Sequence, residues 1–274
     1  NALVHNITQF QDIIYQISNS FGIKIYGSIG FGKKFWDYLV EIYGAPSNTN
    51  IINFPGYTDR CPSEQSDIVI HIHSIKQDIV FEASNKIIEL LSQCSLIKKI
   101  DEIYGFKYKD SRDLTGFIDG TKNPKGNELR SLASLDNNGN SYLLIQKFVH
   151  NLNKWNLESL DDKENIIGRT MKESIELKDK LNTSHISRVD IKNEHNKGIK
   201  IVRHSLPYGS AGGDKGLIFL AYSNTINSFE TQLKRMFGMS DEYSDKLMDY
   251  TKPYNSGYYY IPSTDILKDI IKQK

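Results

Sequence analysis

The first 21 residues carry apolar side chains at every third or fourth position. This spacing puts them on one face of a helix, so it predicts an amphipathic helix at the start of the chain. The apolar positions are Leu3, Val4, Ile7, Phe10, Ile13, Ile14, Ile17 and Phe21. Residues 23–31 instead alternate apolar with small or polar side chains, which is typical of a half-buried strand. The other elements predicted in the first half are a helix at 35–43, a loop at 44–66, a strand at 67–74, a helix at 81–91 and a hairpin or long strand at 97–109.

The second half repeats this order of strands and helices. The pattern predicts strands at 142–149, 199–204, 217–222 and 258–261, and helices at 155–161, at 229–237 and at the C-terminal end. Two successive β-α-β-β-α-β units predict an α+β fold of duplicated ferredoxin-like units with antiparallel sheets. The first unit lacks its opening strand, which we expect before Asn1. We therefore expect an N-terminal unit at residues 1–135 and a C-terminal unit at residues 136–274.

Charge and cysteine content narrow the classes of function. The chain has 34 basic and 33 acidic residues, interleaved along its length, and this balance argues against a nucleic-acid surface, which needs a clustered basic excess. Cys61 and Cys94 cannot form a disulfide framework, so we expect free thiols in a reducing, cytoplasmic compartment. No apolar run approaches the roughly 18 residues that a membrane span requires, so we expect no membrane association.

The motifs of several common enzyme classes are absent from the sequence. It contains no G-x-x-x-x-G-K-[ST], G-x-G-x-x-G, G-x-S-x-G or H-E-x-x-H pattern. His71 and His73 share one face of the strand predicted at 67–74 and are a candidate metal pair. Because no third ligand is evident, buried histidines with hydrogen-bond partners are the favoured interpretation.

Two segments are unusual for a purely structural role. Residues 116–124 (GFIDGTKNP) hold Asp119 between glycines and end on Asn-Pro, as expected of a sharply turning loop where backbone approaches a ligand. Taken alone, this segment is better explained as an ordinary Asp-Gly turn. Residues 200–216 (KIVRHSLPYGSAGGDKG) run from a strand into a loop that contains four glycines. A flexible hairpin loop explains that segment, and phosphate binding would need a following helix N-terminus that the pattern does not predict.

Four motifs follow one another along the chain. They are GFIDGTKNP at 116–124, IIGRT at 166–170, TSHISRVD at 183–190 and IVRHSLPYG at 201–209. Further segments of the same kind are FPGY at 54–57, LKRMFG at 233–238 and YTKPYNSGYYYIPS at 250–263. In this order and spacing the chain resembles the dye-decolorizing peroxidase family over nearly its whole length, and most of all the compact bacterial-type subgroup.

The resemblance implies a haem peroxidase that holds one haem b per chain in its C-terminal half. It assigns His185 as the axial ligand of the haem iron, with Asp119 and Arg203 activating hydrogen peroxide on the opposite face of the haem. Asp245 matches the acid that hydrogen-bonds the ligating imidazole. Further cofactor contacts are expected from Gly120, Thr121, Asn123, Ser205, Leu217 and Phe219, of which Leu217 and Phe219 are equally compatible with core packing.

Elementary chemistry agrees with these assignments. Peroxide cleavage needs a base to move a proton and a fixed positive charge to stabilise the leaving oxygen, and Asp119 and Arg203 supply these two groups. A carboxylate on the second ring nitrogen of His185 strengthens its donation to iron. Neighbouring residues on a strand point to opposite faces, so His204 faces away from any cavity that Arg203 enters. We therefore expect His185, and not His204, to be the ligand.

The predicted reaction oxidises phenols, aminoaromatics and dyes in single-electron steps, with hydrogen peroxide as the oxidant. The alternatives are a protein that binds haem for storage, delivery or iron release, and a stress protein with an empty pocket. We expect a homo-oligomer, a dimer or larger. Most of the 16 tyrosines and two tryptophans are expected to pack in the core. The candidates for passing electrons from bulky donors at the surface are Trp36, Trp155, Tyr258, Tyr259 and Tyr260.

Overall fold

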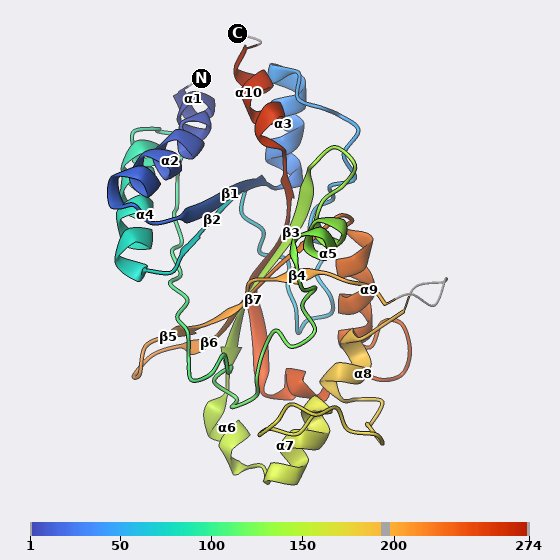
Figure 1. Cartoon of the computed structure of the whole chain (residues 1–274). Coiled ribbons are helices and arrows are strands. Elements are labelled where there is room, and N and C mark those ends of the chain that lie inside the picture. Colours follow the sequence, from blue (N-terminus) through green and yellow to red (C-terminus); the bar gives the residue numbers. More distant parts are fainter. Residues whose placement is uncertain (1, 193–197, 273–274) are drawn as a thin grey trace. The chain divides into compact units, whose positions relative to one another are not determined.

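The computed structural model of the chain describes residues 2–192 and 198–272 (Figure 1). Its internal contacts form two compact units. The first unit comprises Asn1–Thr49, Asp67–Glu102 and Tyr259–Lys274, and the second comprises Asn50–Ser66 and Ile103–Tyr258. Each unit is built from segments that are separate in the sequence, and the division expected between residues 135 and 136 stays a prediction.

The first unit contains the amphipathic helices that the apolar spacing predicted. The helical pattern at the start of the chain forms two helices that are separated at Gln9. The helices are α1 (Ala2–Thr8), α2 (Phe10–Phe21), α3 (Lys33–Tyr43), α4 (Gln77–Ser92) and α10 (Thr264–Lys272). Left-handed glycines end two of them, because Gly22 and Gly44 follow α2 and α3 with φ of 62°.

The two predicted strands of this unit pair as an antiparallel ladder. Strand β1 (Ile25–Phe31) pairs with β2 (Ile68–Ser74), and Phe31 also pairs with Tyr260. Helix α2 packs on β1, and α4 packs on β2 and on α2. A Cβ atom at Gly27 would lie 2.6 Å from the ring of Phe10, so only glycine allows α2 to approach β1 this closely.

Strand β6 organises the second unit, because other strands pair with both of its edges. The strands are β3 (Ser141–His150), β4 (Val202–Arg203), β5 (Leu206–Gly209), β6 (Lys215–Ser223) and β7 (Thr251–Ile261), the last of which continues into the first unit. Strand β3 lies on one edge of β6, from Tyr142↔Ser223 to Val149↔Gly216, and β4 and β5 lie on the other. All three pairings are antiparallel, as predicted.

The helices of the second unit are short and several begin at a capping side chain. They are α5 (Asn127–Ser134), α6 (Leu152–Leu157), α7 (Leu160–Ile167), α8 (His185–Val189), α9 (Asn227–Met236) and the 3₁₀ helix η1 (Lys246–Asp249). The side chains of Asn151, Ser159 and Ser184 accept hydrogen bonds from backbone N–H groups in the first turns of α6, α7 and α8. These side chains satisfy donors that have no partner inside the helix.

Several predicted elements have different bounds in the structure. The strand or hairpin expected at 97–109 is wrong, since that segment makes only one bridge, between Gly105 and Tyr208. The helix expected at 155–161 is two helices, because Ser159 caps α7 in the middle of the predicted span. Of the strand expected at 199–204 only Val202–Arg203 pairs, whereas the strand expected at 258–261 begins seven residues earlier, at Thr251. Helices α5 and α8 were not predicted.

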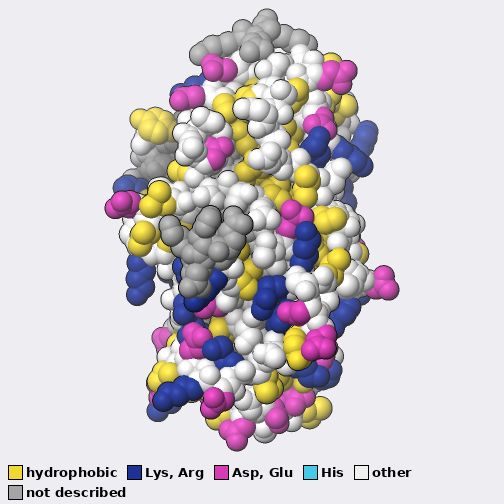
Figure 2. Space-filling view, turned by 90° about the vertical axis from the view of Figure 1, so that its right-hand side faces the viewer, with side chains coloured by type: hydrophobic (Ala, Val, Ile, Leu, Met, Phe, Trp, Pro, Cys, Tyr) yellow, Lys and Arg dark blue, Asp and Glu magenta, His cyan; other side chains and the backbone are white. Residues whose placement is uncertain are grey.

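The interleaved charges and the lack of long apolar runs in the sequence are also seen in the structure. Basic and acidic side chains lie beside one another on the face shown in Figure 2. Among residues 2–192 and 198–272, no helix combines the length and the apolar character that crossing a bilayer requires.

Candidate active site

A cavity of about 210 Å³ lies within the second unit. Apolar side chains from β3, β6, α8 and α9 form much of its lining. Asp119, His185 and Arg203 line the same cavity, although 84 residues separate the first of them from the last. The structure therefore brings together the three residues that the resemblance assigned to peroxide activation and iron binding.

His185 is held by a buried carboxylate. It is the first residue of α8, directly after the capping Ser184. Its Nδ1 lies 2.7 Å from Oδ2 of Asp245, which is fully buried. The other oxygen of Asp245 accepts a hydrogen bond from the backbone N–H of Leu247 at 2.9 Å. Because Nδ1 is engaged, Nε2 is the ring nitrogen that a metal can bind, and the carboxylate makes it a stronger donor.

Asp119 and Arg203 form an ion pair in the cavity. Arg203 Nη1 lies 3.3 Å from Asp119 Oδ1, and both side chains are partly exposed. Oδ1 of Asp119 also accepts a hydrogen bond from the backbone N–H of Gly120, at 2.6 Å. Gly120 has φ of +75°, a conformation that glycine adopts without strain. The turn therefore points a carboxylate at a guanidinium beside a space where a ligand fits.

Asn123 joins the Asp119 loop to strand β4. Its side-chain amide accepts a hydrogen bond from the backbone N–H of Arg203 and donates one to the backbone oxygen of the same residue, both at 2.8 Å. These two bonds imitate a strand neighbour. They set the position of Arg203 relative to the loop that carries Asp119.

The other predicted cofactor contacts divide into two groups. Thr121, Leu217 and Phe219 line the cavity, whereas Gly120, Asn123 and Ser205 are not among its lining residues. Ser205 Oγ accepts a hydrogen bond from the backbone N–H of Leu220 across the β4–β6 edge. Contact of these residues with a cofactor stays a prediction.

His204 does not line the cavity that Arg203 lines. Its Nε2 lies 2.9 Å from Nη2 of Arg130, and its ring meets Tyr222 edge-on. The alternation of side chains along the strand therefore separates these two neighbours as predicted.

The aromatic residues expected to pass electrons from bulky donors at the surface are all buried, and their part in electron transfer stays a prediction. Their exposed fractions are 1% for Trp36, 1% for Trp155, 0% for Tyr258, 2% for Tyr259 and 2% for Tyr260. Three successive buried tyrosines mean that both faces of β7 are covered there. A period-2 pattern that would report one exposed face is therefore missing from the sequence.

A polar network in the cavity wall was missed by the sequence analysis. His150 Nε2 lies 3.2 Å from Asp113 Oδ1, and His150 Nδ1 lies 2.7 Å from Thr251 Oγ1. Burial raises the pKa of Asp113. Hydrogen bonds from His150 and Thr115 and the charge of His150 lower the pKa by more than burial raises it, so the net effect is a lowered pKa. His150 is 37 residues from Asp113 and 101 from Thr251, so no local motif announces the network.

Asp113→Asn is expected to destabilise the protein at pH 7 by about 1–3 kcal/mol, the usual cost of losing a hydrogen bond to a buried charged group. Because the pKa of Asp113 is lowered in the folded state, the unfolded chain binds this proton first as the pH falls. The stabilisation is thus complete above the unfolded value of about 3.9 and is lost as the pH falls through the lower folded value. Chemical denaturation at several pH values measures this.

The matched control is Asp110→Asn, because Asp110 is exposed in the same loop. It should leave the free energy of unfolding almost unchanged. Equal effects of the two substitutions, or an unchanged acid dependence in Asp113→Asn, would contradict the assignment.

The donor set of the cavity fits haem better than a bare metal ion. In the described part of the chain, no three or more His, Cys, Asp or Glu residues gather in a way that would hold an ion. Iron in a porphyrin brings four nitrogen ligands of its own and needs only one axial residue from the protein. A largely apolar cavity that is lined by the carboxylate-bound imidazole of His185 meets that need.

Comparison with known protein families identifies two matching regions. The family model for the N-terminal part of Dyp-type peroxidases matches residues 9–107, and that for the C-terminal part matches residues 110–266. A dye-decolorizing peroxidase of Mycolicibacterium paratuberculosis is 32% identical over 247 residues, which are 87% of this chain and 69% of that protein. Another, from Mycobacterium tuberculosis, is 32% identical over 251 residues, covering 87% of this chain and 73% of that protein.

Solved structures of similar proteins share the fold. A dye-decolorizing protein from V. cholerae superposes with a TM-score of 0.90 at 40% identity, covering 97% of this chain and 90% of that one. A variant of DypB from Rhodococcus jostii, solved in complex with haem, gives a TM-score of 0.87 at 27% identity, with 98% and 90% covered. The predicted α+β fold of duplicated ferredoxin-like units is thereby confirmed.

Proposed function

The chain belongs to the Dyp-type peroxidase family and is a haem peroxidase, and on that premise we propose that Asp119, Arg203 and His185 are the working residues of its catalytic centre. The observation that carries the proposal is the Asp119–Arg203 ion pair in the cavity that His185 also lines. A protein that only stores or delivers haem has no need of a paired acid and guanidinium there, so this pair favours catalysis over the haem-handling alternative.

Haem, when bound, supplies the iron at which peroxide binds and the electrons that cleave its O–O bond. Asp119 takes a proton from the peroxide oxygen that binds and returns it to the oxygen that leaves. Arg203 holds a permanent positive charge beside the developing negative charge. His185 would hold the iron through Nε2, and Asp245 orients the imidazole through its contact with Nδ1.

Replacing His185 with Ala is expected to abolish the absorption spectrum of histidine-ligated ferric haem and to weaken haem retention, because the cavity loses the imidazole that would hold the iron. Absorption spectra and haem content after gel filtration measure both effects. His204→Ala is the matched control, since His204 follows Arg203 directly but does not line the cavity. The reverse result, with only His204→Ala losing the spectrum, would sink the assignment.

The reducing substrates that we propose are phenols, aminoaromatic compounds and dyes. Supporting the dyes among them, two relatives that are each 32% identical to this chain carry the name dye-decolorizing peroxidase. Steady-state oxidation of one donor from each class by the haem-loaded protein tests the proposal. The proposal would be rejected if the protein oxidised no donor of these three classes with peroxide.

We further propose a homo-oligomer in the cytoplasm. Leu129, Leu132 and Leu135 at α5 are 55%, 65% and 41% exposed, which supports an interface with another copy. Cys61 and Cys94 are both free and buried, which supports a reducing compartment. Sedimentation of the purified protein and fractionation of its source cells test the two statements.

A further inference from the structure

The helix that carries His185 is too short to hold its own position. Helix α8 has only five residues, and helices of fewer than about 12 residues are marginally stable in water without tertiary contacts. Asp245 holds the ring of His185 through Nδ1, so other contacts in the second unit must hold the helix itself. The direction in which the imidazole points therefore depends on the partners of α8.

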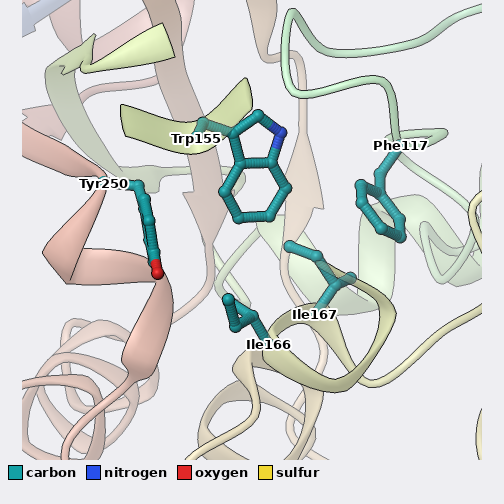
Figure 3. Close-up of a cluster of buried hydrophobic side chains, with 5 residues drawn as sticks. All are labelled: Phe117, Trp155, Ile166, Ile167 and Tyr250. Carbon is teal, nitrogen blue, oxygen red and sulfur yellow. The ribbon is translucent and has the colours of Figure 1, made fainter. Parts of the chain in front are cut away.

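Helix α7 gives α8 a support of apolar contacts. It packs against α8, and its residues Ile166 and Ile167 belong to a buried cluster, in which Figure 3 shows both of them beside the ring of Trp155. A Cβ atom at Gly168, directly after α7, would lie 3.0 Å from Oγ of Ser184, directly before α8, so the two helices approach closely. Apolar contacts are non-directional, so they keep α8 in place without fixing its rotation.

A buried guanidinium on α8 supplies the missing direction. Arg188 follows His185 by three residues, and only 2% of it is exposed. Its Nε donates a hydrogen bond to the backbone oxygen of Arg235 at 3.1 Å, and its Nη1 donates to the backbone oxygen of Asn182 at 3.4 Å. Its Nη2 donates to Oδ1 of Asp241 at 2.6 Å. A planar guanidinium satisfies three fixed acceptors in one orientation, so these bonds fix the rotation of α8.

Helix α9 also donates hydrogen bonds to α8. Nη2 of Arg235, in the last turn of α9, donates to the backbone oxygen of Ser187 at 3.0 Å. The side-chain amide of Gln232 donates to the backbone oxygen of Val189 at 3.5 Å. Carbonyl groups at the C-terminal end of a helix have no partner inside it, and α9 supplies partners for these two. Hydrogen bonds therefore join α8 and α9 in both directions.

Two carboxylates of one short segment after α9 hold the charged side chains of α8. Asp241 binds Arg188, and Asp245, four residues later, binds His185. Residues three apart lie on the same side of a helix, so the segment grips α8 at two points of one face. Oδ1 of Asp241 also accepts a hydrogen bond from the backbone N–H of Tyr243 at 3.0 Å. The hydrogen bond from Arg188 lowers the pKa of Asp241, which keeps this carboxylate ionised at neutral pH.

We propose that Arg188 and Asp241 are positioning residues for the iron ligand. Their ion pair holds α8 in the rotation at which the imidazole of His185 keeps its contact with Asp245 and presents Nε2 to the cavity. Stability alone does not require such a pair, because apolar side chains often replace a buried ion pair at little cost. Apolar side chains do not supply its direction. The inference deepens the proposed function, since it rests on His185 being the iron ligand.

Asp241→Asn in the haem-free protein gives the first test. The amide keeps an oxygen for the backbone N–H of Tyr243 but removes the charge that Arg188 binds. The proton on Nδ1 of His185, identified by its absence from His185→Ala, should then exchange with water about tenfold faster or more, since a hydrogen bond to a charged group typically changes an equilibrium by at least that factor. Proton nuclear magnetic resonance measures the exchange.

The iron–imidazole stretching frequency of the haem-loaded ferrous protein, measured by resonance Raman scattering, gives the second test. A carboxylate on the second ring nitrogen strengthens the donation of an imidazole to iron. The frequency should therefore fall in Asp241→Asn and in Arg188→Lys, towards that of Asp245→Asn, which loses this carboxylate directly. A lysine keeps the charge, but its compact ammonium lacks the planar fork that meets three fixed acceptors. The side chain of Asp241 is 33% exposed, so Asp241→Asn should fold and decides the test even if Arg188→Lys does not fold.

Two control variants separate positioning from a general loss of charge or stability. Glu242→Gln makes the same kind of change at the exposed residue that follows Asp241. Leu143→Val removes one methylene group from a fully buried side chain of β3 that does not line the cavity, so it lowers stability away from α8. Both variants should keep the exchange rate and the stretching frequency of the parent.

The outcomes distinguish this inference from the proposed function. An unchanged exchange rate and an unchanged frequency in Asp241→Asn would overturn the inference, while loss of the histidine-ligated spectrum in His185→Ala still supported the ligand. Equal changes in Leu143→Val would also overturn it, because they would reflect a general loss of stability. A histidine-ligated spectrum that survives in His185→Ala would instead reject the proposed ligand, and the inference with it.

Discussion

Arg203→Leu is expected to slow the first peroxide-dependent change in the absorption of the haem-loaded protein by about 10²- to 10³-fold, the usual cost of losing a stabiliser of developing charge. The loss should persist at every pH. The guanidinium is permanently charged and stands 3.3 Å from Asp119 in a partly enclosed site, where water cannot replace a fixed charge. Deprotonating the oxidant does not restore it. Stopped-flow absorption from acidic to alkaline pH measures the rate.

Arg130→Leu is the matched control for that experiment. Arg130 contacts His204, the residue that follows Arg203 in the sequence. Because Arg130 does not line the cavity, the loss of its charge should leave the rate almost unchanged. Recovery of Arg203→Leu with rising pH would show that Arg203 serves mainly in proton transfer, against the role proposed here.

Asp119→Asn is expected to slow the same spectral change by about 10²- to 10⁴-fold at acidic pH, the range for losing a general base. Unlike the arginine variant, it should recover as the pH rises. The physical reason is that a growing fraction of peroxide is then already ionised and needs no base. The amide also keeps an oxygen that can accept the backbone hydrogen bond of Gly120, so the turn should hold.

Asp110→Asn, in the exposed part of the same loop, controls for a general change in charge. Its rate should follow that of the parent at all pH values. A pH-independent loss in Asp119→Asn, combined with pH-dependent recovery in Arg203→Leu, would require exchanging the two roles. Because both variants are compared by the shape of their pH profiles, similar magnitudes of loss do not blur the result.

Local sequence was sufficient wherever an element depends on its own spacing of apolar residues. The helices α2, α3, α4 and α9 and the strands β1, β2, β3 and β6 lie where the apolar periods place them. Each of the four helices buries one stripe of side chains, and that stripe is written in the order of the residues. The motif contexts around Asp119, His185 and Arg203 were also readable, because each is a short contiguous segment.

Tertiary structure decided the elements and contacts that depend on distant partners. Residues 97–109 look like a strand but form only one bridge, between Gly105 and Tyr208. A strand needs a neighbouring strand along its length, and this segment has none among the described residues. Strand β7 runs from Thr251 through three successive buried tyrosines. Because both of its faces are covered there, its sequence lacks the alternation of apolar and polar residues by which a strand is recognised. Pairing with distant strands is a property of the fold and leaves no local period.

The same division holds within the site. The sequence by itself supplied the proposed acid, guanidinium and imidazole, since the resemblance of three short motifs assigns Asp119, Arg203 and His185 to these roles. The resemblance already assigned Asp245 to the imidazole of His185, but only the folded chain showed its contact with Nδ1 and placed Asp113 on His150 and Glu158 on the hydroxyl of Tyr250. These pairs are 60, 37 and 92 residues apart. A side chain's partner sets its proton affinity and orientation, and that partner is chosen by packing across the fold, which no local stretch of sequence records.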